Sequence, residues 1–220
     1  MPTTKSAKNH EISLYTKSSD SGLKGLFIVI EGIDGSGKTT QTKLLAEKLK
    51  RQNLNTLVTA EPSDSPVGKH IKDILNGNLN VPPQMLALLF AADRIEHVYF
   101  TIKPALEQGN IVVSDRYYYS SIAYQGGMGV DQNYIRCINS FVVKPDLAFL
   151  ISVDPLSARK RLKDQRKQLQ LTEDEELQLK AFKIYEELVK QGDLIEIDGN
   201  SSIEEISNSI WELVTGKLIK

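Results

Sequence analysis

The 220-residue sequence predicts an α/β fold in which helices cover both faces of a parallel sheet. Short, continuous apolar runs recur along the chain, as is typical of strands buried on both faces. Segments with helical spacing of apolar residues lie between these runs, and this alternation favours right-handed strand–helix–strand crossovers. Because ligands of this fold class bind at the carboxyl ends of the strands, we expect the functional residues directly after them.

The strands are predicted from five apolar runs, at residues 26–30, 56–59, 111–113, 147–153 and 194–197. A helix containing residues 44–49 follows the first run, and a longer helix precedes the third. The apolar stripe of this longer helix consists of Met85, Leu89, Ala92, Ile95, Val98 and Ile102. Capping-box pairs predict where the last two helices begin, Thr172 with Glu175 and Ser202 with Glu205. No repeat or linker interrupts residues 26–220, which are predicted to form one domain.

Composition and charge narrow the class of protein. The 27 basic and 28 acidic side chains give a net charge of -1, which argues against a nucleic-acid binder with a broad basic field. The longest apolar run, residues 147–153, is far shorter than the about 18 residues of a membrane span. Residues 1–25 lack the apolar core of a secretory signal and are predicted to be a flexible tail. With one cysteine, Cys137, the chain is expected to be cytoplasmic.

A phosphate-binding loop is predicted where the first strand ends. Residues 32–39 fit the pattern Gly-x4-Gly-Lys-Ser/Thr and stand between an apolar strand and a helix, as the motif requires. Backbone N–H groups and the helix N-terminus bind phosphates, Lys38 reaches the outer phosphates, and Thr39 can hold Mg²⁺. The residues expected to contact the nucleoside triphosphate are Gly32, Ile33, Asp34, Gly35, Ser36, Gly37, Lys38, Thr39 and Thr40.

The end of the third strand indicates the type of reaction. Asp115 stands there as a second candidate ligand of Mg²⁺, and Arg116 offers a bidentate guanidinium for a second anion. The Asn-Lys-x-Asp string of GTP switches does not occur, and a motor ATPase more often continues with an acidic residue after the aspartate. The pair therefore favours phosphoryl transfer between two phosphates.

Two segments are candidates for an acceptor site. Phe90 and Arg94 are four residues apart, so they lie on one helix face, although Phe90 also fits a buried stripe. Residues 115–127 combine four tyrosines with serines and a glutamine, which suits stacking and hydrogen bonding to a nucleoside. Tyrosines also serve as amphipathic packing residues, so both interpretations stay open at this point.

The ordered motifs resemble those of thymidylate kinases, a family of P-loop nucleoside monophosphate kinases, over residues 26–216. The resemblance rests on EGIDGSGKTT, Glu61-Pro62, LFAADR, DRYYYSSIAYQGG and Lys144-Pro145-Asp146. It implies a three-layer P-loop kinase fold with a five-stranded parallel sheet. It also implies transfer of the γ-phosphate of ATP to dTMP with Mg²⁺, and a homodimer.

The resemblance also assigns acceptor residues. Phe90 is expected to stack on thymine, Arg94 and Gln125 to address the base edge, and Arg116 to grip the acceptor phosphate. Asp34 would approach the sugar hydroxyl or orient that phosphate grip, and Tyr124 would fill the space of a ribose 2′-hydroxyl. The full set expected at dTMP is Asp34, Glu61, Pro62, Phe90, Arg94, Arg116, Ser120, Tyr124 and Gln125.

Two positions depart from the family pattern. Many members have a basic residue where this chain has Ala60, and some have an arginine in the loop where it has Gly35. The missing charge is expected from a lid at about residues 157–172, whose candidates are Arg159, Arg161 and Arg166. The residues expected to act in catalysis are Lys38, Asp34, Arg116, Arg161 and Arg166.

Two other functions stay open on the sequence. The change at Ala60 is compatible with another acceptor, such as a free deoxynucleoside or a different pyrimidine monophosphate. A nucleotide-binding regulatory protein without turnover is the alternative from a different class, although the intact Lys38, Thr39, Asp115 and Arg116 argue against it.

Overall fold

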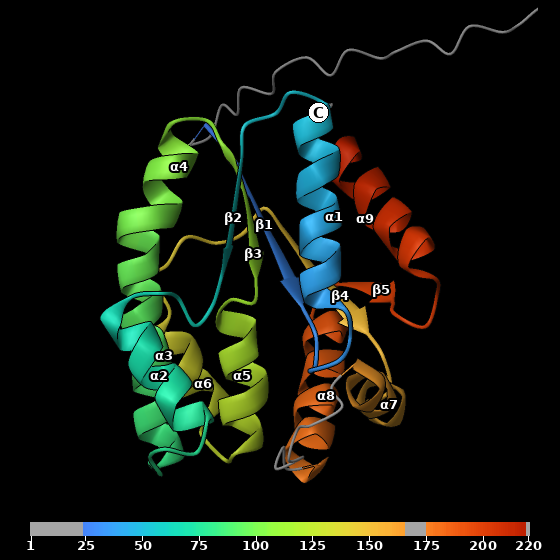
Figure 1. Cartoon of the computed structure of the whole chain (residues 1–220). Helices are drawn as coiled ribbons and strands as arrows, with labels where there is room; N and C mark the ends of the chain where they lie inside the picture. Colours follow the sequence, from blue (N-terminus) through green and yellow to red (C-terminus); the bar gives the residue numbers. More distant parts are fainter. Residues whose placement is uncertain (1–23, 166–174, 219–220) are drawn as a thin grey trace, which may run out of the picture.

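The computed structural model describes residues 24–165 and 175–218. Its sheet has five parallel strands in the order β2-β3-β1-β4-β5, which confirms the predicted fold class (Figure 1). The strands are β1 (Leu26–Glu31), β2 (Thr56–Ala60), β3 (Ile111–Asp115), β4 (Leu147–Ser152) and β5 (Ile195–Asp198). All five lie within about two residues of the apolar runs that predicted them, since such boundaries are rarely defined more closely.

The order of the strands fixes which helices cover which face. The connection from β1 to β2 runs toward one edge of the sheet, and all later connections run toward the other. Right-handed crossovers therefore place α1 on one face and the helices between β2 and β5 on the other. The last helix, α9, returns to lie beside α1 (Figure 1). The helices are α1 (Lys38–Arg51), α2 (Pro66–Leu75), α3 (Pro83–His97), the π-helix η1 (Val98–Ile102), α4 (Lys103–Glu107), α5 (Tyr118–Gly127), α6 (Gln132–Ile138), α7 (Pro155–Gln165), α8 (Glu175–Lys190) and α9 (Ile203–Leu218).

The functional residues gather where the strand order reverses. β1 and β3 are neighbours, with Ile30 paired to Asp115, but the chain leaves them toward opposite edges of the sheet. This switch point is where doubly wound sheets bind ligands. The loop after β1 and the Asp115-Arg116 pair at the end of β3 consequently lie side by side.

The core explains the apolar runs. Every residue of β1 is buried, and so are the first four of β3, because both strands lie inside the sheet with helices on each face. A smaller apolar cluster of Ile71, Ile74 and Leu86 lies between α2 and α3, and Phe90 packs against it. This second cluster holds α2 and α3 together beside the switch point.

The helix α3 forms as predicted, but its buried face differs from the apolar stripe. Met85 and Ile95 of that stripe are exposed, whereas Asp93, Arg94 and His97 are buried. The physical reason is that the three polar side chains find hydrogen-bond partners inside the protein, so their burial is tolerated. The helix therefore presents apolar side chains to the surface.

The chain ends and helix caps complete the fold. The predicted capping box at α9 is confirmed, since Ser202 N–H donates to Glu205 Oε2 (2.9 Å) and Glu205 N–H to Ser202 Oγ (3.2 Å). Thr172 and most of the predicted tail lie outside the described residues. Lys24 and Gly25 both donate their backbone N–H to the Leu106 carbonyl. Within residues 24–165 and 175–218, no helix is long and apolar enough to span a membrane.

Candidate active site

The loop after β1 forms an open cradle of backbone amides. Gly32, Gly35 and Gly37 all have positive φ angles, which lets the chain turn its N–H groups inward. Gly37 is the N-cap of α1, so no N-cap side chain occupies the first N–H groups of the helix. The first turn of α1 also has no acidic residue. The positive end of α1 therefore faces this loop without a competing carboxylate on the helix, as anion binding requires.

Lys38 lies in the cradle with little solvent around it. It is buried, its Nζ donates to the Ile33 carbonyl (2.8 Å), and it lies 3.7 Å from Asp34 Oδ1. Burial, helped by the charge of Arg116, lowers the pKa of Lys38 to about 8, although nearby carboxylates oppose this shift. A phosphate chain in the cradle would stabilise the charged form of Lys38.

Two oxygen ligands for a cation meet at the edge of the cradle. The Thr39 hydroxyl donates to Asp115 Oδ2 at 2.5 Å, so the first turn of α1 and the end of β3 are in contact. Magnesium prefers oxygen ligands and is commonly held by one or two protein groups together with phosphates and water. The described residues contain no group of three acidic, histidine or cysteine side chains that could form a cage by themselves. Thr39 and Asp115 therefore fit a cation that arrives with a nucleotide.

Arg116 joins the cradle to the acceptor side. Its backbone has φ 74°, which is uncommon for a side-chain-bearing residue. The guanidinium forms an ion pair with Asp34 and donates to Ser120 Oγ (3.0 Å) and the Gly32 carbonyl (3.3 Å). It also lies 5.2 Å from the centre of the Tyr124 ring. Arg116 is thus held between the phosphate loop and α5.

A cavity of about 620 Å³ opens next to Arg116. Its lining combines apolar side chains of α2 and α3 with polar side chains of α5 and with the charged pair of Asp34 and Arg116. A planar base packed on the apolar side chains, with its sugar and phosphate near this charged pair, would use both kinds of lining. The structure brings the whole predicted acceptor set to this cavity, namely Asp34, Glu61, Pro62, Phe90, Arg94, Arg116, Ser120, Tyr124 and Gln125.

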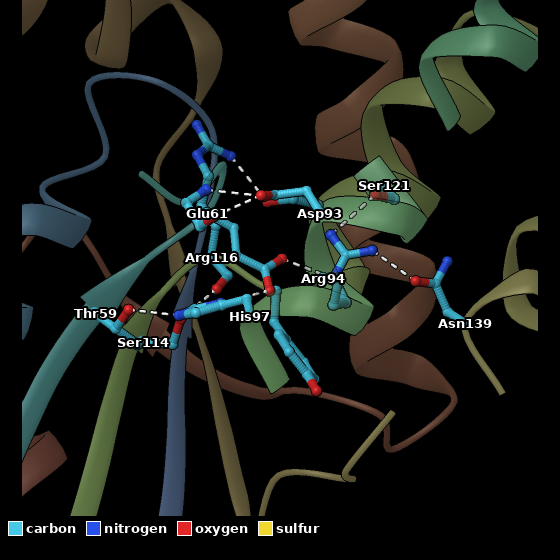
Figure 2. A network of polar contacts seen from close by, with 12 residues as sticks. Thr59, Glu61, Asp93, Arg94, His97, Ser114, Arg116, Ser121 and Asn139 are labelled. Atoms are coloured by element: carbon cyan, nitrogen blue, oxygen red, sulfur yellow. Dashed lines mark hydrogen bonds and ion pairs between the residues drawn. The ribbon is translucent and has the colours of Figure 1, made fainter. Parts of the chain in front are cut away.

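Arg94 belongs to a buried polar network behind this cavity (Figure 2). Its guanidinium donates to Glu61 Oε2 (2.7 Å), Asn139 Oδ1 (2.6 Å) and Ser121 Oγ (3.2 Å). His97 is 3.2 Å from the other oxygen of Glu61. The carboxylate therefore lies between two basic groups. This network fixes Arg94 in the cavity wall, and contact with a base edge stays a prediction.

The other acceptor residues differ in how they are held. Gln125 is buried, and its Oε1 has no hydrogen-bond partner among the described residues. Phe90 is half-buried against the small cluster, so one part of its ring is available to the cavity. The Tyr124 hydroxyl donates to Gln178 Oε1 of α8 at 3.1 Å. The cavity thus combines an aromatic ring, a buried acceptor oxygen without a partner among the described residues, and a tyrosine whose hydroxyl is held by α8.

The structure explains why the loop has Gly35 rather than an arginine. Gly35 has φ +82°, and a Cβ there would lie 2.3 Å from the Ala158 carbonyl oxygen of α7. A side chain at this position would displace α7. Of the predicted lid arginines, Arg159 pairs with Glu175, and Arg161 donates to the Gly199 carbonyl at 2.9 Å. Arg166 lies outside the described residues.

The second position that departs from the family pattern, Ala60, borders a separate hollow. Ala60 lies at the end of β2 and lines a hollow of about 670 Å³, and Pro62 lines both this hollow and the acceptor cavity. Thr39 and Asp115 also line this hollow, and so does Lys72, whose Nζ is 2.7 Å from Asp64. Lys69 of α2 could replace the basic residue that is missing at Ala60 only if it reached one of these two spaces, and it lines neither.

Two buried carboxylates in this region were not predicted as functional residues. Asp93 accepts hydrogen bonds from Ser63 N–H (2.8 Å), Ser63 Oγ (2.5 Å) and Ser65 Oγ (2.8 Å), and thereby shapes the segment after β2. Glu31 at the end of β1 is fully buried beneath Arg116 and α5. The available signal was an acidic residue at the end of an otherwise apolar strand, which requires buried partners.

Comparisons with known proteins identify the family of the chain. A family model described as thymidylate kinase matches residues 30–210. The chain belongs to the thymidylate kinase family. A probable thymidylate kinase of Methanocaldococcus jannaschii is 48% identical over 186 residues, which cover 84% of this chain and 93% of the relative. Another from Pyrococcus horikoshii is 41% identical over 90% of this chain and 99% of its own. The thymidylate kinase of Halothermothrix orenii is 38% identical over 90% of this chain and its full length.

Proposed function

We propose that this thymidylate kinase phosphorylates dTMP to dTDP in the cavity between Arg116 and Phe90, with ATP bound in the loop after β1. The observation that carries the proposal is the contact between the two sites. The phosphate loop and the charged end of the acceptor cavity meet at Arg116, which touches Gly32 and Asp34 of the loop. Two phosphates bound in these sites would face each other, as transfer between them requires.

The reaction needs positioning and charge neutralisation more than covalent help from the protein. An oxygen of the dTMP phosphate attacks the γ-phosphorus of ATP, the bond to the β-phosphate oxygen breaks, and ADP leaves. The acceptor phosphate is already an anion, so no general base is required. In this assignment Lys38 stabilises the charge of the transferring group, and Arg116 exchanges its contact with Asp34 for the acceptor phosphate.

Magnesium is assigned to Thr39 and Asp115. When bound with ATP, Mg²⁺ neutralises charge on the phosphate oxygens and orients the nucleotide. The contact between Thr39 Oγ1 and Asp115 Oδ2 supports this assignment, because both oxygens can turn toward one ion. Among the residues that the structure describes, we assign these two groups to the ion and no others.

At the other end of the cavity, recognition of thymine is assigned to Phe90 and Gln125. The aromatic ring offers a stacking surface. The buried Gln125 Oε1 would accept the N–H of the thymine ring, which satisfies an oxygen that has no partner among the described residues. Tyr124 supports preference for a deoxyribose, because its hydroxyl is fixed by Gln178 at the sugar end.

The arginine that supplies the transition-state charge is assigned to the lid. Arg159 and Arg161 both lie on α7, whose Ala158 packs against Gly35. Their contacts with Glu175 and Gly199 would have to exchange for phosphate oxygens. Arg161→Ala should then reduce kcat strongly and change ATP binding little.

The test is acceptor-dependent ADP release from Mg-ATP over a panel of nucleotides. We expect dTMP to be the preferred acceptor over dUMP, the ribose analogue of dTMP, dCMP, AMP and free thymidine. Preference for the ribose analogue would remove Tyr124 as a steric gate. Preference for dCMP would remove the role given to Gln125.

We also propose that two copies of the chain associate through α3. Met85, Leu88 and Ile95 of this helix and Tyr99 of η1 are all exposed, although they are large and apolar. Their spacing of three, seven and four residues places them on one helical face, and such contiguous apolar surface marks an interface. Light scattering should give a dimer mass, and Ile95→Glu should shift it toward the monomer.

A further inference from the structure

The buried carboxylate of Glu31 has a complete set of hydrogen-bond donors. Its Oε1 accepts the backbone N–H groups of Tyr117 (2.8 Å) and Ser120 (3.2 Å). Its Oε2 accepts from Ser120 Oγ (2.6 Å) and from the Tyr185 hydroxyl (2.8 Å). Burial raises the pKa of Glu31, while Arg116 and these hydrogen bonds act in the opposite direction. Four donors directed at two oxygens match an ionised carboxylate.

These contacts place Glu31 at the start of α5. Tyr117 is the N-cap of that helix, and Ser120 lies in its first turn. A negative charge at this position is stabilised by the positive end of the helix. Because α5 also bears Tyr124 and Gln125, the carboxylate at the end of β1 fixes one wall of the acceptor cavity relative to the phosphate loop.

Glu31 also reaches Arg116 through one hydroxyl. Arg116 donates to Ser120 Oγ at 3.0 Å, and that hydroxyl donates its own hydrogen to Glu31. The other carboxylate at Arg116 is Asp34, which has a 33% exposed side chain, whereas Glu31 is 0% exposed. Asp34 can therefore be displaced by an incoming phosphate, but Glu31 cannot leave its site.

We infer that Glu31 is a positioning residue for the acceptor phosphate, acting through Ser120 to hold the guanidinium of Arg116 in place when Asp34 is displaced. The inference rests on the proposed role of Arg116 as the phosphate grip. It assigns unequal roles to the two carboxylates of the EGID segment. Asp34 is the exchangeable partner of Arg116, and Glu31 is its permanent one.

The test is Glu31→Gln, which keeps the shape of the side chain but removes its charge and one acceptor oxygen. We expect the KM for dTMP to rise about tenfold, as is typical of a lost hydrogen bond to a charged group. The Kd of Mg-ATP measured without acceptor should change less than twofold. Ser120→Ala should raise the KM for dTMP in the same way. The double variant should show less than the product of the two effects, because both substitutions interrupt the same hydrogen-bonded connection from Glu31 through Ser120 to Arg116.

Two control variants separate positioning from loss of stability. Asp146→Asn makes the same chemical change at a carboxylate that accepts Phe27 N–H (2.9 Å) at the other end of β1. Ser207→Ala removes a buried hydroxyl from α9. Both should lower the melting temperature without a selective change in the KM for dTMP.

The outcomes distinguish this inference from the proposed function. An unchanged KM for dTMP in Glu31→Gln overturns the inference, and so does an equal loss of ATP and dTMP binding that follows the melting temperature as in Asp146→Asn. Multiplicative effects of Glu31→Gln and Ser120→Ala would exclude the route through Ser120. The role of Arg116 is tested separately by Arg116→Ala, since an unchanged KM for dTMP in that variant removes the phosphate grip itself.

Discussion

In the phosphate loop, consecutive residues of one segment surround the anion site, whereas side chains from α2, α3, α5 and α8 line the acceptor cavity. The loop works through backbone geometry, with glycines at positive φ and a helix N-terminus that has no competing acid. The cavity wall works through buried ion pairs such as Glu61 with Arg94. The difference teaches that substitutions in the loop should affect turnover first, while substitutions in the wall should affect folding first.

The largest expected effect falls in the cavity wall, for Arg94→Ala. Removing this guanidinium leaves Glu61 buried with His97 as its remaining basic neighbour. Asn139 Oδ1 and Ser121 Oγ also lose the N–H groups from which they accept hydrogen bonds. Loss of one partner of a buried pair costs about 3–5 kcal/mol. Chemical denaturation should show this decrease in the free energy of unfolding.

The matched control for that variant is Arg136→Ala. Arg136 also pairs with a carboxylate, Asp193 at 2.8 Å, but both side chains are about one-third exposed. Such a pair contributes about 1 kcal/mol or less. If the two variants lose equal free energy of unfolding, the buried ion pair of Arg94 contributes no more stability than the partly exposed pair of Arg136.

In the phosphate loop, Lys38→Ala should show the opposite balance. Removing a charge that stabilises the transferring group typically reduces kcat by roughly 10²–10³-fold. Stability should stay the same or increase, because burial already disfavours the charged lysine and lowers its pKa to about 8. Steady-state kinetics and thermal melting measure the two effects. Lys50→Ala, an exposed change in the last turn of α1, is the control that should alter neither.

The contact between the loop and α7 can be isolated with two glycines. Gly35 and Gly77 have nearly the same φ, +82° and +80°, but only Gly35 has a neighbour, the Ala158 carbonyl, within the reach of a Cβ. Alanine at either position pays about 1–2 kcal/mol for the left-handed conformation. Gly35→Ala should lose more stability than Gly77→Ala and should also reduce kcat, as measured by melting and ADP release. Equal losses would show that α7 moves away freely.

The sequence predicted the features that depend on local order. The strands follow from continuous apolar runs, and the loop follows from a motif in which each residue acts at its own position. Asp115 and Arg116 were also located, because they stand at the end of a strand. These signals need no knowledge of distant contacts.

The remaining features depend on contacts between residues far apart in the chain. Nothing in the sequence around Arg94 indicates that Asn139 is its partner, and nothing near Gly35 indicates Ala158. The apolar stripe of α3 did not predict that Met85 and Ile95 would be exposed, because burial of Arg94 and His97 depends on Glu61. Glu31 was overlooked for the same reason.

The smallest expected effect concerns Gln125, which is buried in the cavity wall and is also assigned a role in binding the base. Gln125→Met removes an oxygen that is buried without a partner among the described residues, so the free protein should become more stable, as thermal melting would show. The same change removes the acceptor for the thymine N–H, which should lower the preference for dTMP over dCMP by about 2- to 10-fold in kcat/KM. The control is Gln191→Met, at an exposed glutamine that accepts a hydrogen bond from Arg136 (2.9 Å). This change should not increase the stability and should not alter the preference for dTMP over dCMP. If Gln125→Met loses stability and keeps its selectivity, Gln125 supports the fold of the cavity wall and does not recognise the base. Residues that act on the substrate would then lie closer to Arg116.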